Sequence, residues 1–230
     1  MNKYNIMYIS PHLDDVVFSC SQLIRNQIKS NNKILITTIF TNYSDTHNNP
    51  FLNGKIRFKE DLNALKNLNV KGNYLNYSEL MVRNNLEEYT LLALILDLIQ
   101  IFLNFDKYNK LINSINTELQ KIIDKNKIKS IYIPLGIGFH PDHLITYRAC
   151  CNLKNVKIYG YEEFPYSQNK IYCFLRKPFI KKNKVIKVKI NKNQKLKDIL
   201  IYNSQFKVVF DNYNFKDIFK NYTENYYLIN

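Results

Sequence analysis

NIMYISPHLDDVVFSCSQLIRNQI, residues 5–28, predicts a buried strand, a polar turn and a helix in immediate succession. Residues 5–10 form a short apolar run that ends before a proline, as expected of a buried strand. Apolar residues then recur at helical spacing over residues 16–28. Asp14 and Asp15 stand at the predicted helix N-terminus, where the helix dipole favours negative charge. A strand followed directly by a helix is typical of an α/β protein.

The same alternation continues along the chain. Further strands are predicted over residues 33–41, 128–134 and 156–161, and helices over 55–68, 87–104, 107–125 and 142–151. Alternating strands and helices predict an α/β fold with a Rossmann-like, mostly parallel sheet flanked by helices. The pattern changes after residue 161, where the predicted elements are strands over 171–176 and 184–190 and a helix over 195–203.

These patterns favour one domain over residues 1–230, with an α/β core (1–161) and a C-terminal β-rich extension (162–230) that completes the fold. Apolar residues make up 46% of the chain and charged residues 23%, which excludes a disordered class. The most apolar stretch, Leu91–Leu103, is too short to span a bilayer and predicts a buried helix. The four cysteines show no metal or redox spacing, and no signal peptide is evident, so we expect a reduced, cytoplasmic protein with no membrane partner.

The chain is strongly basic. It has 33 Lys and Arg residues against 19 Asp and Glu residues, a net charge of +14, which favours an anionic partner. Eleven of the basic residues, and no acidic one, fall between Glu163 and Asp198. The main interpretation is a solvated strand face, and the alternative is a collar that attracts a phosphate-bearing substrate. Nucleic acid is not an expected partner, because no recognised motif accompanies the charge.

Two polar loops carry the candidate chemistry. SPHLDD (residues 10–15) and GFHPDH (residues 138–143) each follow a predicted strand. Ligands of an open α/β sheet gather outside the carboxyl ends of its strands, so the histidines and aspartates of both loops should converge.

Histidines and aspartates in one crevice can form a catalytic metal site. Two imidazoles and one carboxylate leave an open position on zinc, and bound zinc lowers the pKa of water to about 7. A further carboxylate can accept the proton, and a spare imidazole can stabilise a developing oxyanion. Taken alone, Asp14 and Asp15 are more typical of helix caps, and Pro141-Asp142 of a helix start. The joint pattern favours a metal or catalytic site.

At this point the sequence resembles the PIG-L/LmbE-like zinc-dependent de-N-acetylases. SPHLDD and HPDH (residues 140–143) match the two signature motifs of that family. Weaker matches are RFKED at 57–61, YEEFPY at 161–166, Lys197 and YNSQ at 202–205. The resemblance implies that His12, Asp15 and His143 bind zinc. It also implies that Asp14 is the general base and that His140 stabilises the oxyanion.

Further roles come with the same resemblance. Asp142 would orient the histidine that opens its motif, and Arg57 would contact the sugar or phosphate part of the substrate. Gly138 and Phe139 depart from relatives that place a tyrosine near the reaction centre just before the second motif. Glu79 stands near a position where the family often has a substrate-contacting aspartate, and its equivalence is open.

The implied reaction is removal of the N-acetyl group from a GlcNAc-like amino sugar, nucleotide-linked or free, with Zn²⁺ or another divalent metal as cofactor. One alternative is hydrolysis of another small N-acyl conjugate. Another is a non-catalytic carbohydrate- or polyanion-binding protein on the same fold. The complete set of histidines and aspartates in both motifs argues against the non-catalytic alternative.

Overall fold

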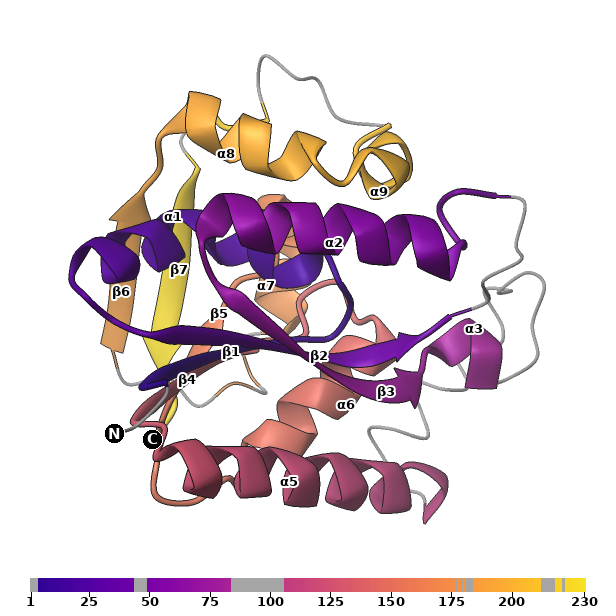
Figure 1. Cartoon of the computed structure of the whole chain (residues 1–230), viewed down its shortest axis with the longest axis vertical. Coiled ribbons are helices and arrows are strands. Elements are labelled where there is room, and N and C mark those ends of the chain that lie inside the picture. The colour runs from indigo at the N-terminus through magenta and orange to yellow at the C-terminus, as the bar shows by residue number, and fades with distance from the viewer. Residues whose placement is uncertain are drawn as a thin grey trace.

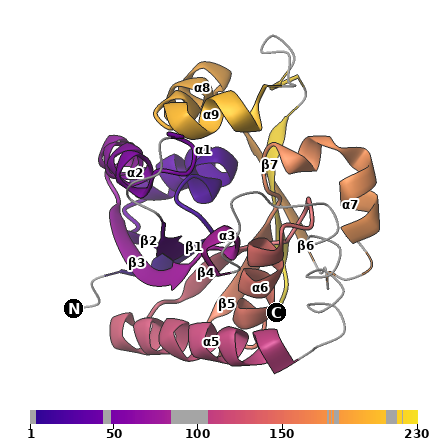
Figure 2. The same ribbon diagram turned by 90° about the vertical axis from the view of Figure 1, so that its right-hand side faces the viewer.

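The computed structural model describes residues 4–43, 49–83, 106–176, 178, 180, 184–211, 218–220 and 222–230. Within them, seven strands form one sheet with helices on both faces (Figures 1 and 2). The strands are β1 (Ile6–Ser10), β2 (Ile34–Asn42), β3 (Lys71–Ser78), β4 (Ser130–Pro134), β5 (Lys157–Tyr161), β6 (Lys184–Lys189) and β7 (Thr223–Leu228). The helices are α1 (Asp15–Lys29), α2 (Gly54–Leu68), α3 (Leu80–Arg83), α5 (Asp106–Asn126), α6 (Pro141–Cys150), the short 3₁₀ helix η1 (Tyr166–Gln168), α7 (Lys170–Arg176), α8 (Lys192–Leu200) and α9 (Asn203–Val209).

The strand order β3-β2-β1-β4-β5-β7-β6 explains where the candidate site forms. The chain runs outward from β1 through β2 to β3, then returns to place β4 on the other side of β1. All these strands and β5 pair in parallel, whereas β6 and β7 complete the sheet antiparallel. The predicted mostly parallel α/β sheet is therefore confirmed. Its strand order reverses between β1 and β4, where open α/β sheets bind ligands.

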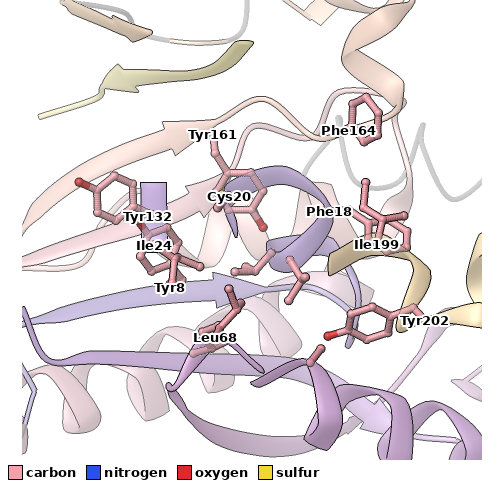
Figure 3. Close-up of a cluster of buried hydrophobic side chains, with 14 of the residues drawn as sticks. Tyr8, Phe18, Cys20, Ile24, Leu68, Tyr132, Tyr161, Phe164, Ile199 and Tyr202 are labelled. Atoms are coloured by element: carbon pink, nitrogen blue, oxygen red, sulfur yellow. The ribbon is translucent and has the colours of Figure 1, made fainter. Parts of the chain in front are cut away.

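The sheet is buried on both faces because its central strands carry apolar residues on both sides. On β1, Ile6 and Tyr8 join the hydrophobic cluster under α1, α2, α8 and α9, part of which is shown in Figure 3. Met7 and Ile9 point the other way, into the cluster under α5 and α6. A strand with side chains in two cores is strongly fixed in register, since a one-residue slip would exchange its faces. The loop after β1 therefore has a fixed starting point.

The predicted strand over 171–176 is wrong, because this segment forms α7. Periodicity alone does not distinguish a short apolar run in a strand from one in a helix. Here Asn169 decides the outcome, because its side chain accepts a hydrogen bond from the backbone N of Ile171 at 2.9 Å and so caps a helix. The predicted strand over 184–190 is confirmed as β6.

The structure also contains two strands that were not predicted, β3 and β7. Strand β3 lacks the pattern of a buried strand, because it is polar and only partly buried. The predicted helix over 87–104, with Leu91–Leu103, lies outside the described residues. No helix in the described part of the chain is both long and apolar enough to traverse a lipid bilayer. The four cysteines are free thiols.

Part of the basic C-terminal segment is structural. Lys195 is 1% exposed and its Nζ lies 2.6 Å from Glu224 Oε1 on β7. Glu224 also accepts hydrogen bonds from the backbone N of Gln22 and Leu23 on α1. Arg176 is likewise buried. A solvated face therefore does not account for every basic residue between 164 and 197.

Helix α2 buries polar residues as well as apolar ones. Leu65 and Leu68 are buried, and so are Arg57 and Asp61, whereas Ile56 and Leu62 are exposed. The carboxylate of Asp61 accepts hydrogen bonds from the Tyr74 and Tyr202 hydroxyls, both at 2.7 Å. The Tyr202 hydroxyl also lies 3.0 Å from the carbonyl oxygen of Leu13, in the loop after β1. Asp61 thus connects α2 to the first motif through the start of α9.

Asp61→Asn is expected to remove the fall in the free energy of unfolding that the wild type should show as pH rises toward neutrality. Burial raises the pKa of Asp61 from an ordinary 3.8 to about 7, so the folded state binds this proton more tightly than the unfolded chain. The free energy of unfolding of the wild type should then fall as pH rises from about 4 to about 7. Relative to wild type, the variant should gain more than about 1 kcal/mol between pH 4 and pH 8, measured by urea denaturation. A pH-independent difference between the two proteins would contradict this.

Candidate metal centre

The structure brings the two polar loops together at the carboxyl ends of β1 and β4. The ring centroid of His12 lies 5.0 Å from that of His140 and 5.4 Å from that of His143. The His140 and His143 rings are 5.2 Å apart. One nitrogen from each of the three imidazoles lies within 4.8 Å of the others. Side chains from distant parts of the sequence therefore share one small volume.

Asp15 lies between two of these imidazoles. Its Oδ2 is 3.3 Å from His12 Nδ1 and 3.3 Å from His143 Nε2. Donor atoms that surround zinc tetrahedrally at about 2.0–2.1 Å are themselves about 3.3 Å apart. The backbone N of His12 donates to the same oxygen at 2.8 Å and fixes its position. His12, Asp15 and His143 therefore offer donor atoms suited to a divalent metal ion, with both nitrogens at ligand spacing from the Asp15 oxygen.

Carboxylates hold the outer nitrogens of both candidate ligand histidines. His12 Nε2 lies 3.0 Å from Asp142 Oδ2, and His143 Nδ1 lies 3.3 Å from Glu163 Oε1. Each outer nitrogen can donate to its carboxylate, which leaves His12 Nδ1 and His143 Nε2 with lone pairs facing Asp15. Histidine ligands of metals in proteins usually have such a carboxylate partner.

The charges of the cluster are strongly coupled. Burial acts to lower the pKa of His12 and of His143, but their carboxylate partners outweigh it and raise these values to about 9 and about 10. Burial acts to raise the pKa of Asp15, but His143 and His12 hold it well below its usual range. In the absence of an ion, protonated imidazoles thus balance the buried carboxylate. A divalent cation can replace that positive charge.

His140 is held in a different state. Its Nδ1 accepts a hydrogen bond from the backbone N of Asp142 at 3.2 Å, and His140 is the N-cap of α6. Burial and the neighbouring His12 lower its pKa to about 3, so the ring is neutral. Since Nδ1 is an acceptor, the proton of the neutral ring lies on Nε2. This geometry suits a hydrogen-bond donor better than a metal ligand.

The carboxylate of Asp142 contacts a different histidine from the one expected. The expected partner was His140, but Oδ2 of Asp142 lies against His12 Nε2 and accepts from the backbone N of Leu80 at 3.0 Å. Its Oδ1 accepts from Arg83 Nη2 at 2.5 Å. Only the backbone amide of Asp142 holds His140. The difference arises because α3, which the sequence did not indicate, packs directly on this carboxylate.

Asp14 remains outside the set of candidate ligands. It occupies the N-cap position of α1 but makes no side-chain capping hydrogen bond. Its Oδ1 lies 3.8 Å from Arg57 Nη2. Burial, followed by the charge of Asp15, raises its pKa to about 6. A buried carboxylate with a pKa near neutrality beside a metal site suits a general base.

Arg57 lines the same pocket as the motif residues. Its guanidinium lies over the Tyr43 ring at 4.2 Å, and its Nη1 is 3.5 Å from Glu79 Oε2. Its buried Nε has no hydrogen-bond partner in the described part of the protein. Because this Nε is fully buried, a substrate would meet Arg57 through the part of the side chain that lines the pocket. Glu79, whose role the sequence left open, also lines the pocket.

The pocket is small, and the polar residues of the two motifs form part of its lining. Its volume is about 150 Å³, and it contains all six motif residues discussed above. Apolar and amide side chains complete the walls: Phe51, Leu52, Leu80, Met81, Tyr166, Gln205 and Val209. Gly138 has φ +94°, and a Cβ there would lie 2.9 Å from Cγ of Tyr166. The glycine therefore leaves room for the ring of Tyr166 beside the second motif.

Sequence comparison identifies the family. A family model described as GlcNAc-PI de-N-acetylase, PIG-L, matches residues 7–154. The chain belongs to the PIG-L family. The match includes both motif loops and α2, and so every candidate site residue of the sequence analysis. Comparison with curated proteins gives no match.

Solved structures confirm the PIG-L fold. The zinc-inhibited form of teicoplanin deacetylase is 19% identical, with a TM-score of 0.77 over 97% of each chain. An N,N'-diacetylchitobiose deacetylase from Pyrococcus horikoshii, with a bound inhibitor, is 18% identical, with a TM-score of 0.57 over 90% of this chain and 73% of its own. A 4-carboxy-2-hydroxymuconate hydratase from Pseudomonas putida is 10% identical, with a TM-score of 0.58 over 99% of this chain and 96% of its own. The fold therefore occurs with more than one chemistry.

Glu163 is a site residue that sequence reasoning did not single out, although it lies in the YEEFPY segment of the PIG-L resemblance. It is 1% exposed and accepts hydrogen bonds from the backbone N of Gly136 at 2.6 Å and of Ile137 at 3.2 Å. The same carboxylate contacts His143. It thus connects the loop after β4 to a candidate metal ligand.

Glu163→Gln is expected to weaken metal binding about 10- to 100-fold, the usual cost of losing the carboxylate behind a ligand histidine. Competition with a chromophoric chelator would measure the affinity. Glu162→Gln is the matched control, because Glu162 is adjacent but hydrogen-bonds to Asn225 and Tyr227 instead. Equal affinities in the Glu163 variant and the wild type would mean that Glu163 supports only the loop.

Proposed function

We propose that this PIG-L family protein is a metal-dependent hydrolase that removes the N-acetyl group from an amino sugar. One observation carries the proposal: Asp15 lies at ligand spacing from one nitrogen of His12 and one of His143, and a second carboxylate, that of Asp14, lines the same pocket without being part of this set. Ligands alone would suit a structural metal ion. A further buried carboxylate in the same pocket supports a catalytic role.

A bound zinc or similar ion would polarise the acetyl carbonyl and make water a stronger acid. Asp14 accepts a proton from the attacking water as the water oxygen bonds to the carbonyl carbon. His140 donates a hydrogen bond from Nε2–H to the carbonyl oxygen, and keeps its proton, as that oxygen gains negative charge. When the C–N bond breaks, Asp14 returns the proton to the nitrogen. The products are acetate and a free amino sugar.

The walls of the pocket support a sugar substrate. Arg57 and Glu79 line the pocket, where both can bind the hydroxyl groups of a sugar and the guanidinium can bind a phosphate beside the reacting amide. The net charge of +14 favours an anionic form such as a nucleotide-linked sugar. The inhibitor-bound chitobiose deacetylase and the teicoplanin deacetylase support the same substrate class.

The deciding experiment measures acetate released from a panel of free, phosphorylated and nucleotide-linked N-acetyl sugars. The protein is loaded separately with Zn²⁺, Co²⁺, Mn²⁺ and Ni²⁺, because one relative is described as zinc-inhibited. We expect metal-dependent acetate release from at least one class and one bound ion per chain. If the protein binds one metal ion per chain but hydrolyses only N-acyl compounds that are not sugars, the proposed substrate class is wrong and the reaction class stands. Protein that binds no divalent ion would favour the non-catalytic alternative.

A further inference from the structure

Helix α7 presents its apolar side chains to solvent. Ile171, Phe174 and Leu175 are 66%, 73% and 49% exposed, and their i, i+3, i+4 spacing places them on one stripe. Arg176, on the other side of the helix, is 3% exposed. A surface helix of a globular protein normally has the reverse arrangement, with its apolar stripe inward.

Specific polar contacts fix this orientation. Arg176 Nε donates to the carbonyl oxygen of Leu135 at 2.7 Å, and its guanidinium lies 4.6 Å from the centre of the Tyr147 ring. The Cys173 thiol lies 3.4 Å from the carbonyl oxygen of Ser167. Rotating α7 to bury its apolar stripe would break these contacts and leave the Leu135 carbonyl unpaired. The outward stripe is therefore built into the fold.

Basic residues of the edge strand β6 lie on the same side of the sheet. Val185 is opposite Tyr227 on β7, and Tyr227 belongs to the hydrophobic cluster against which Cys173 packs. Cross-strand neighbours point to the same face, so Val185 lies on the α7 side. Lys187 and Lys189 alternate with buried-side residues and share this face, and both are exposed. We call the stripe of α7 with Lys170, Val185, Lys187 and Lys189 the α7 surface.

We propose that the α7 surface docks on an anionic phospholipid bilayer. Helices that lie in a membrane interface combine an exposed apolar stripe with nearby Lys or Arg residues, and lysines near an anionic leaflet add electrostatic attraction. The net charge of +14 has the complementary sign. This proposal revises the expectation of no membrane partner, and it is independent of the reaction catalysed.

Docking would bring the catalytic pocket close to the bilayer. Helix α7 follows directly after η1, and Tyr166 of η1 lines the pocket. The helix lies on the opposite side of the molecule from α2 (Figure 2). The seven residues of α7 bury little area, so the binding should be weak, reversible and dependent on lipid charge.

The test is co-sedimentation of the full chain with vesicles of phosphatidylcholine alone or mixed with phosphatidylglycerol. Wild type should partition at least tenfold more strongly into the mixed vesicles, and less as salt increases. Phe174→Ser should reduce this partition about tenfold, and Lys187→Gln several-fold. Leu62→Ser, which changes an exposed apolar residue of α2, should have no effect.

Several results would overturn the proposal. Equal partition into both vesicle types, or equal partition of the Phe174 and Leu62 variants, would exclude the α7 surface as a lipid contact. A wild-type dimer that Phe174→Ser converts to a monomer, without vesicle binding, would assign the surface to a second copy of the chain. A large fall in melting temperature in Phe174→Ser with unchanged vesicle binding would mean that the stripe packs within the molecule.

Discussion

Asp14→Asn is expected to lower the turnover number by about 10²- to 10⁴-fold, the usual contribution of a general base, with metal content unchanged. The structure separates the two effects because Asp14 is not among the atoms spaced as ligands. Acetate release and elemental analysis of the same preparation would measure both. The isosteric amide preserves packing at the start of α1, so folding should be retained.

Asp124→Asn on the exposed side of α5 serves as the control for the same chemical change at a distant position. Near-normal turnover in Asp14→Asn would show that another group takes the proton. Loss of metal in this variant would instead place Asp14 in the coordination sphere, and the division of roles between the two adjacent aspartates would be wrong.

His143→Ala should lose the metal, and activity with it, whereas His140→Ala should keep the metal and lose only activity. His143 can present a lone pair on Nε2 to a metal ion that displaces the proton from this nitrogen, because its Nδ1 can donate to Glu163. His140 presents an N–H, because its Nδ1 accepts from the backbone of Asp142. Metal content after dialysis would compare the two variants directly.

The same pair of variants distinguishes two possible ligand sets. The three imidazoles are close enough to form a site without Asp15. If His140→Ala loses metal as completely as His143→Ala, the three-histidine set is correct. In that case His140 is no longer available to stabilise the oxyanion.

The motif loops are predictable because each follows a short, mainly apolar run, and such runs form the buried central strands of an α/β sheet. Residues 5–10 and 128–134 are runs of this kind, and β1 and β4 are adjacent. Their polar loops therefore meet at the same edge. The local sequence pattern is enough to predict that His12 and His143 lie in one crevice.

The side chains that hold the candidate metal ligands in place are not predictable in the same way. Glu163 and Arg83 reach the site from elements whose positions depend on tertiary packing, and neither belongs to a periodic pattern. The apolar residues of α7 predict a strand only on the assumption that they are buried. In the structure a capping side chain and a buried arginine determine that segment.

Residues 7–154, which match the PIG-L family, do not contain everything that holds the two motif loops. The phenol of Tyr202 reaches back to the Leu13 carbonyl, and the carboxylate of Glu163 reaches back to Gly136. A chimera that joins this segment to the C-terminal third of a relative must therefore keep a tyrosine at 202 and a glutamate at 163. Recombination or domain grafting at residue 154 would otherwise leave the two motifs without their supports.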